Sequence, residues 1–495
     1  MRASGILMPI FSLPGRYGIG AFSEAAYRFV DFLESAGQKY WQILPLGPTS
    51  YGDSPYQSFS TFAGNPYFID LDQLYGRGWL TQEDLDREAE GWPESGIDYH
   101  KLYTQRYDTL RLAYQRSNIN QDPEFEEYVE ANRDWLPDYA LFMALKDRFG
   151  GVSFVHWEEK IRFRDPETLR TLEEEMQEEI RFQEFMQYVF HEHWENLRRY
   201  AGEHGIGFIG DIPIYVSEDS AEVWTHPELF KMDEAGNKVS VAGCPPDAFA
   251  VTGQLWGNPI YNWDAHRETG YDWWIRRLRA CMEMFDVVRI DHFRGFESFY
   301  EIPAGDPTAE RGVWTKGPGM DFFRAVQEAL PDMKVIAEDL GFITDEVRQM
   351  VKDTGYPNMR VLEFAFDSNE PSGNSIYYPY NYDRNCVVYL GTHDNDPIVA
   401  WLQKFWETGV PQIKRYADVD TDDIMELARK MIILAHSSVA DLCVLQMQDY
   451  LRTGAEGRIN VPSTLGGNWM WRMAPGADSP ELAARIADVT RRYGR

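Results

Sequence analysis

Four acidic side chains stand at the ends of short apolar runs, and together they could carry out chemistry on a glycosidic bond. The runs cover residues 207–211, 285–291, 334–339 and 387–394, and the acids are Asp211, Asp291, Glu338 and Asp394. One carboxylate can attack an anomeric carbon, while a second carboxyl with a raised pKa protonates the leaving oxygen. Retaining enzymes hold such a pair about 5–5.5 Å apart, and inverting enzymes hold it farther apart.

The spacing of these acids predicts which of them work together. Asp291 and Glu338 are 47 residues apart, which suits one strand–helix–strand unit with a loop extension and predicts neighbouring strands. Asp394 lies 56 residues farther on, and we expect it to bind sugar hydroxyls and help distort the ring. Arg289 shares a strand face with Asp291, so its charge would keep that carboxyl ionised.

The elements that must position these acids alternate between strand and helix. Helical patterns fill residues 271–284, 319–329 and 344–352, between the apolar runs. This alternation favours a parallel sheet, whose strands are covered on both faces and therefore read as continuous apolar runs. In a β/α barrel the carboxyl ends of the strands converge on the active site. The sequence therefore predicts an α/β fold, a (β/α)8 TIM barrel with large insertions.

A simpler interpretation is that each acid caps the helix that follows it, which Asp does well. For Asp211 that alternative stays open. Four acids at four strand ends, with Arg289 beside one of them, favour a catalytic cluster.

The rest of the chain divides by composition. We expect residues 1–75 to begin the barrel, with one buried strand within 40–46, and residues 201–495 to complete it. Residues 76–200 contain long charged stretches such as 171–180, with few Gly or Pro, and are predicted to form a mainly helical insertion subdomain. Residues 236–263 are rich in Gly, Pro, Asn and Trp without a visible period. They are expected to form a loop, a candidate lid over the active site.

Composition excludes several classes of protein. The chain of 495 residues has 48 basic and 79 acidic side chains and a net charge of −31, which argues against binding nucleic acid or anionic membranes. Aromatic residues make up 15%, including 16 Trp, and flat aromatic faces also serve sugar-binding clefts. The four cysteines show no zinc-site spacing, so no metal is expected: Cys244, Cys281, Cys386 and Cys443.

The chain has no sign of export or membrane insertion. The N-terminal apolar run is broken by Pro9 and Pro14, which makes a poor signal peptide. No stretch approaches the roughly 18 apolar residues of a membrane span. We therefore expect a cytoplasmic location.

Several motifs together resemble a known family. The segments 210–215 (GDIPIY), 289–295 (RIDHFRG), 337–341 (AEDLG) and 391–395 (GTHDN) resemble the conserved regions of 4-α-glucanotransferases, or amylomaltases. These form glycoside hydrolase family 77 in the α-amylase clan. The similarity extends over nearly the whole chain, with further matches at 54–56, 63–66, 243–249, 253–261, 458–460 and 467–472.

The resemblance implies a role for each matching residue. Asp291 would be the nucleophile, Glu338 the general acid/base and Asp394 the stabiliser of the transition state. Six further residues would bind substrate: Arg289 and His393 at the donor glucose, Tyr56 by stacking, Asp211 and Asn460 at nearby hydroxyls, and Trp256 from the loop. The family needs no cofactor or metal.

The resemblance also implies the reaction. Segments of α-1,4-glucan would move between maltooligosaccharides, glucose and amylose by retaining double displacement through a covalent glycosyl-enzyme, and long amylose could be cyclised. The residues alone do not choose the acceptor, so an α-amylase-type hydrolase and a catalytically silent glucan-binding protein are the alternatives. Oligomeric state stays open. The chain departs from the family pattern at Pro397 and Ser463, where Thr and Gly are expected.

A structural interpretation remains open for some of these residues. Trp256 and Tyr261 could instead be packing residues that anchor the loop. Because alternate residues on a strand point to opposite faces, His292 and Asp339 are expected to face away from their catalytic neighbours. Trp469 and Trp471 are expected to be core residues.

Overall fold

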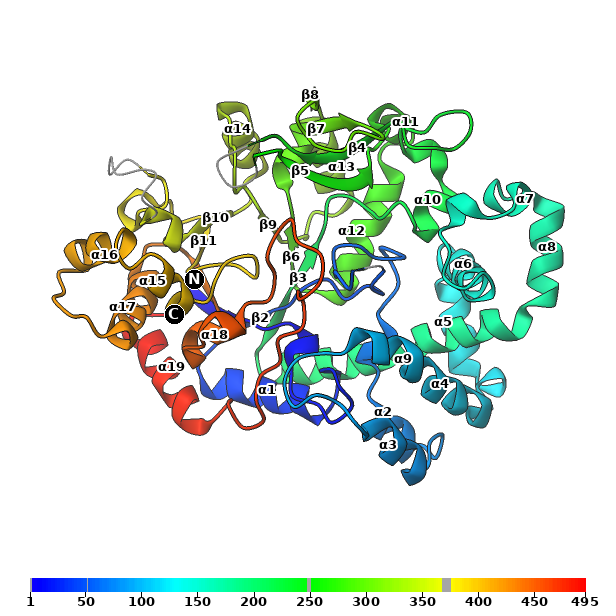
Figure 1. The fold of residues 1–495 in the computed structure, drawn as a ribbon, viewed down its shortest axis with the longest axis horizontal. Coiled ribbons are helices and arrows are strands. Elements are labelled where there is room, and N and C mark those ends of the chain that lie inside the picture. The colour runs from blue at the N-terminus through cyan, green and yellow to red at the C-terminus, as the bar shows by residue number, and fades with distance from the viewer. Residues whose placement is uncertain (1, 51, 247–250, 367–374) are drawn as a thin grey trace.

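Eight parallel strands close into a barrel in the computed structural model, which describes residues 2–50, 52–246, 251–366 and 375–495 (Figure 1). Around the barrel the strand order is β1-β12-β11-β10-β9-β6-β3-β2. The strands are β1 Ala3–Leu7, β2 Tyr40–Gln42, β3 Gly207–Ile212, β6 Val287–Ile290, β9 Val335–Ala337, β10 Asn358–Val361, β11 Cys386–Tyr389 and β12 Leu442–Gln446. The predicted (β/α)8 barrel is confirmed, and the four acid-terminated runs are β3, β6, β9 and β11.

Three barrel strands have no counterpart in the sequence prediction: β1, β10 and β12. The sequence of β10, NMRV, has a charged residue in its middle, and β1 contains Gly5. That glycine is needed because a Cβ there would come within 2.7 Å of the Tyr40 carbonyl oxygen. Strand β10 separates β9 from β11, so Asp394 belongs two strands away from Glu338 rather than beside it.

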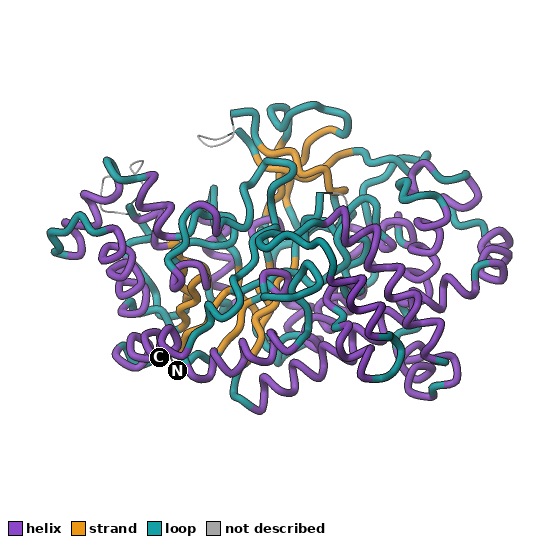
Figure 2. Tube along the Cα trace, turned by 60° about the horizontal axis from the view of Figure 1, so that its bottom comes forward, coloured by secondary structure: helices purple, strands orange, loops and turns teal. Residues whose placement is uncertain are grey.

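Helices cover the outside of the barrel (Figure 2). The three predicted helices are present as α12 Asp272–Met284, α13 Met320–Ala329 and α14 Asp345–Thr354. The barrel is also flanked by α1 Glu24–Ser35, α15 Ile398–Lys404, α16 Gly409–Ala417, α17 Ile424–Ser437 and α19 Pro480–Arg492, and the short α18 Met447–Leu451 follows β12. The two ends of the chain meet, because Arg495 Nη1 donates to the Ala3 carbonyl at 3.1 Å.

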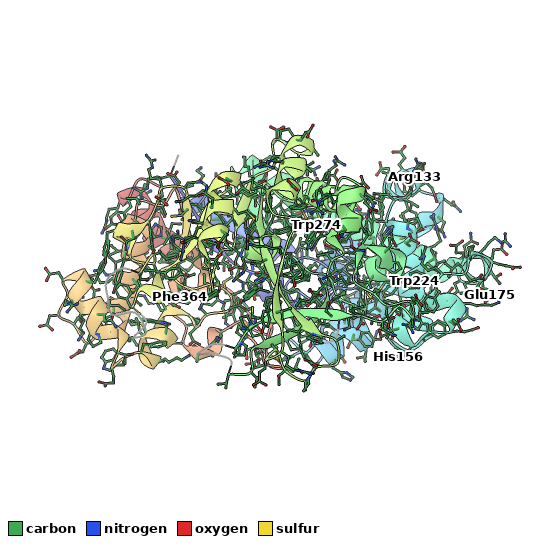
Figure 3. All side chains as sticks on the ribbon, turned by 90° about the horizontal axis from the view of Figure 1, so that it is seen from above. Arg133, His156, Glu175, Trp224, Trp274 and Phe364 are labelled. Carbon is green, nitrogen blue, oxygen red and sulfur yellow. The ribbon has the colours of Figure 1, made fainter. Side chains whose placement is uncertain are left out.

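The connection from β2 to β3 is helical. It contains α2 Leu71–Gly76, α3 Gln82–Ala89, α4 Tyr99–Ser117, α5 Pro123–Ala131, α6 Leu136–Arg148, α7 Glu159–Arg162, α8 Pro166–Glu175 and α9 Gln177–Glu203. Figure 3 shows Arg133 and Glu175 toward one end of the molecule, well away from Phe364. The last part of α9 packs on the barrel, where the Trp194 ring lies 4.7 Å from that of Phe208 in β3. Because α9 continues past residue 200, the boundary between the insertion and the barrel at that residue stays a prediction.

A four-stranded antiparallel sheet stands above the barrel, in the order β5-β4-β7-β8 (Figure 1). Its strands are β4 Ser240–Cys244, β5 Gln254–Pro259, β7 Ser298–Pro303 and β8 Val313–Lys316, and the short helices α10 Ala221–Thr225 and α11 Trp263–Glu268 lie nearby in the chain. The prediction of a loop without regular structure at 236–263 was wrong for β4 and β5. Their register shifts between Val241 and Gly243, which hides the alternation. Residues 247–250 of the expected lid lie outside the described residues.

Among the residues that the structure describes, no helix is both long enough and apolar enough to cross a membrane.

Candidate active site

Asp291 and Glu338 follow directly on two neighbouring strands of the barrel. The preceding residues, Ile290 in β6 and Ala337 in β9, are register partners, and the Glu338 N–H donates to the Ile290 carbonyl at 3.1 Å. Adjacent strands are about 4.7–4.9 Å apart, so the two acids start from backbones at that spacing. This arrangement suits the short carboxyl separation of a retaining pair.

Arg289 links Asp291 to a second carboxylate on the next strand. Its Nη2 donates to Asp291 Oδ1 at 2.9 Å, and its Nη1 contacts both oxygens of Asp211 at 2.7 and 2.6 Å. Burial opposes the Arg289 charge, but the two carboxylates raise the pKa of the guanidinium well above its usual value. A fixed cation therefore lies against the Asp291 carboxyl group.

Asp211 lies inside β3 and does not cap a helix. Besides Arg289 it accepts a hydrogen bond from the Tyr56 hydroxyl at 2.8 Å, and its side chain has no exposed surface. Burial raises the pKa of the Asp211 carboxyl, and the Arg289 charge opposes that rise. Asp211 therefore holds the side chains of Arg289 and Tyr56 in position by accepting their hydrogen bonds.

The surroundings of Glu338 favour its protonated form. Burial first, and then the charge of Asp291, raise the pKa of the Glu338 carboxyl to about 8. Two main-chain N–H groups fix its position: His292 N donates to Oε2 at 2.7 Å and Leu340 N donates to Oε1 at 2.8 Å. Near neutral pH this site therefore favours a protonated Glu338, the state that a general acid requires.

His292 occupies the left-handed backbone region, with φ 50° and ψ 48°. Strand β6 ends at Ile290, so the strand alternation used to place His292 on the other face does not extend to it. The His292 ring packs edge-on against Trp256, with ring centroids 4.8 Å apart and an interplanar angle of 89°. Burial lowers the pKa of His292 to about 4, so the ring is neutral at physiological pH. His is one of the few types that tolerate this backbone conformation.

Asp394 lies in the loop after β11, and its neighbours fix it from three directions. Asn460 Nδ2 donates to Asp394 Oδ1 at 2.6 Å, and His393 Nε2 lies 3.4 Å from the same oxygen. Arg458 Nη2 donates to the Asp394 carbonyl at 2.8 Å. The Asn460 N–H also donates to the His393 carbonyl, at 3.2 Å, so residues 393–394 and 458–460 hold each other.

Tyr56 and His393 form an aromatic wall on this side of the site. Their rings are stacked, with centroids 5.3 Å apart and an interplanar angle of 17°. Trp469, expected to be a core residue, is buried as predicted, and its ring lies 5.9 Å from each of the other two. Trp469 therefore packs against both rings of this aromatic wall.

The remaining predicted residues separate into site and core. Trp256 is half-buried on β5, and its Nε1 donates to Gln254 Oε1 at 3.0 Å. Tyr261 is fully buried and donates to the Ile214 carbonyl, which makes it a packing residue. Asp339 accepts from Met359 N at 2.9 Å and serves the barrel wall, as predicted.

Sequence reasoning missed Arg458, the two N–H groups that hold Glu338, and the wall position of Trp469. Only Arg458 carried a signal, since it stands within the motif at 458–460. Within the described ranges, no group of three or more His, Cys, Asp or Glu side chains is placed to hold a metal ion.

The fold and the carboxyl pair define a class: a β/α-barrel enzyme that acts on glycosidic bonds. A family model described as 4-alpha-glucanotransferase matches residues 8–478. A 4-alpha-glucanotransferase of Clostridium butyricum is 46% identical over 99% of this chain and 100% of its own. One from Thermus thermophilus is 45% identical over 99% of both chains.

Structural comparison agrees. An amylomaltase from Streptococcus agalactiae, solved in complex with acarbose, superposes with a TM-score of 0.96 and 40% identity, covering 100% of both chains. The chain belongs to the 4-alpha-glucanotransferase family, glycoside hydrolase family 77, and its activity is glucan transfer.

Proposed function

We propose that this enzyme moves α-1,4-glucan segments by double displacement, with Asp291 as nucleophile, Glu338 as general acid/base and Asp394 as stabiliser of the transition state. The observation that carries this proposal is the contrast between the two neighbouring carboxyls. Arg289 contacts Asp291 at 2.9 Å, whereas burial and the Asp291 charge raise the pKa of Glu338 to about 8.

The first displacement uses both carboxyls at once. An oxygen of Asp291 forms a bond to the anomeric carbon of the donor as the glycosidic C–O bond breaks. Glu338 gives its proton to the departing 4-oxygen, and the shortened chain leaves as an alcohol. The donor segment stays covalently bound to Asp291.

The second displacement reverses these roles. Glu338, now ionised, takes the proton from the 4-hydroxyl of an acceptor sugar, whose oxygen attacks the anomeric carbon and releases Asp291. Water in the same place would give hydrolysis. We assign the sugar acceptor from the family to which the chain belongs, with maltooligosaccharides, glucose and amylose as donors or acceptors.

Around the donor glucose we assign hydroxyl contacts to Asp394, His393, Asn460 and Arg289, and ring stacking to Tyr56. Because Asp211 is covered by its partners, we assign it a positioning role toward Arg289 and Tyr56 instead of direct sugar contact. We propose that the segment 236–263 forms a lid over the site, with Trp256 as the residue that it brings to the substrate. The acarbose bound by the Streptococcus agalactiae amylomaltase supports a sugar-binding cleft in this family.

Pure maltotriose tests the reaction. We expect glucose and a ladder of longer oligosaccharides while the total of reducing ends stays constant, because each transfer consumes one end for every end it makes. Chromatography by chain length and a reducing-end assay measure both quantities. The Asp291→Ala variant is the control and should form neither product. Rising reducing ends without longer products would identify a hydrolase and contradict transfer.

A further inference from the structure

Two solvent-exposed aromatic rings lie next to the segments that carry the catalytic pair. Phe342, five residues after the end of β9, is 69% exposed, the highest fraction among the aromatic side chains of the described ranges, and Trp314 in β8 is 39% exposed. Their ring centroids are 6.5 Å apart and their planes differ by 22°. Burial in the core therefore does not explain Phe342.

Arg294 ties these rings to both catalytic segments. Its guanidinium carbon lies 3.7 Å from the centroid of the Trp314 ring, and its Nη1 donates to the Phe342 carbonyl. Arg294 follows Asp291 by three residues, and its Nη2 donates to Ser298 Oγ on β7 at 3.0 Å. The ring pair is thus fixed in place relative to the segment after β6.

The segment after β9 also fixes the position of the ring pair, in this case relative to Glu338. Leu340 N, two residues before Phe342, donates to Glu338 Oε1 at 2.8 Å. The exposed pair therefore stands on the Glu338 side of the site, and the wall of Tyr56, His393 and Trp469 stands with Asp394 on the other.

The proposed roles of Glu338 determine which part of a glucan chain lies on each side of the site. Glu338 protonates the leaving oxygen and later deprotonates the acceptor, so the leaving chain and the acceptor chain extend from the Glu338 side. A pyranose ring has an apolar face that packs on exposed aromatic rings, and it carries no charge that would suffer from the −31 net charge of the protein.

We propose that Trp314 and Phe342 form a stacking subsite for a distal glucose unit of the leaving or acceptor α-glucan, beyond the sugar that touches Glu338. This inference rests on the proposed direction of glucan transfer. It predicts a preference for long acceptors over glucose, because only a long chain reaches both Glu338 and the exposed rings.

Acceptor kinetics of the Phe342→Ala variant test the subsite. With a fixed concentration of α-maltosyl fluoride as donor, which is too short to reach the exposed rings, we expect the KM for acceptors of five or more glucose units to rise about fivefold, with kcat unchanged. The KM for glucose as acceptor should stay at the wild-type value. Phe342→Trp, which keeps an aromatic face, should restore the KM for long acceptors.

Phe163→Ala is the matched control, because Phe163 is also an exposed phenylalanine, at 51%, in the helical connection. It should leave every acceptor KM unchanged. Equal KM values for Phe342→Ala and wild type at all acceptor lengths would overturn the subsite, as would an equal rise for glucose and long acceptors. Failure of the wild-type enzyme to transfer onto any sugar would instead overturn the proposed function.

Discussion

At the scale of single residues, Arg289 makes the surroundings of Asp291 different from those of Glu338. Its guanidinium contacts Asp291 on one side and Asp211 on the other, and both contacts are shorter than 3 Å. Glu338 is buried and close to the charge of Asp291, and it forms no ion pair with any residue that the structure describes. In the proposed mechanism, these different surroundings assign the role of nucleophile to Asp291 and the role of acid to Glu338.

This division predicts an alkaline limb in the pH profile. Glu338 must be protonated for the first displacement, so kcat/KM should be constant below its pKa and fall tenfold per pH unit above about 8. Initial rates on maltotriose between pH 6 and pH 10 measure this. Glu338→Gln, assayed with α-maltosyl fluoride because fluoride leaves without a proton, should lack the limb. A wild-type kcat/KM that stays constant up to pH 10, or that already falls as the pH rises from 6, would contradict the assignment.

At the scale of elements, hydrogen bonds to main-chain groups join the loops after β6 and β9 to each other and join the loop after β11 to the segment 458–460. His292 N and Leu340 N bind Glu338, and Arg458 binds the carbonyl of Asp394. The loop after β11 also depends on a buried acid: Asp449, in α18, accepts from Ile398 N at the start of α15 at 2.8 Å. The N-cap residue of α15 is Pro397, whose side chain makes no capping hydrogen bond. Asp449 therefore serves the first N–H group of this helix from outside it.

Asp449 predicts a pH-dependent stability. Burial raises the pKa of Asp449 to about 7, against about 4 in an unfolded chain. Between these values the folded protein keeps a proton that the unfolded chain has released, so stability falls as pH rises and the loss is complete above pH 7. The loss is at most about 4 kcal/mol.

Asp449→Asn keeps the acceptor oxygen and cannot ionise, so it should be more stable than wild type at pH 8 and differ less at pH 5. Urea unfolding at both pH values gives the two free energies. Asp420→Asn, at an exposed position, is the control and should match wild type at each pH. If Asp449→Asn is no more stable than wild type at pH 8, the buried acid does not act as described.

At the scale of the whole molecule, sequence predicted the barrel because strand–helix alternation is a repeated signal. It also predicted the four acids at strand ends, since a barrel gathers those ends on one face. It missed β1 and β10 because Gly5 and Arg360 interrupt their apolar runs. It missed the antiparallel sheet because the register shift between β4 and β5 hides their alternation, and because β4 also pairs with β7, which lies far along the chain.

The candidate site, like the fold, was predicted only in part from the sequence. Types and spacing placed Asp291 and Glu338 together, and Arg289 on the same face as Asp291. The backbone conformation of His292 was beyond reach, because periodicity describes a strand only as far as the strand continues. The burial of Asp211 was also beyond reach, since it depends on Tyr56, which lies 155 residues away in the chain.

The most direct test of the account is to trap the sugar on Asp291. Glu338→Gln can accept a glycosyl group from α-maltosyl fluoride but lacks the base that the second displacement needs, so the covalent adduct should accumulate. Mass spectrometry of the intact protein should show one added maltosyl group, and the peptide containing Asp291 should carry it. A maltosyl group on a different peptide, or steady turnover with no adduct, would contradict Asp291 as the nucleophile.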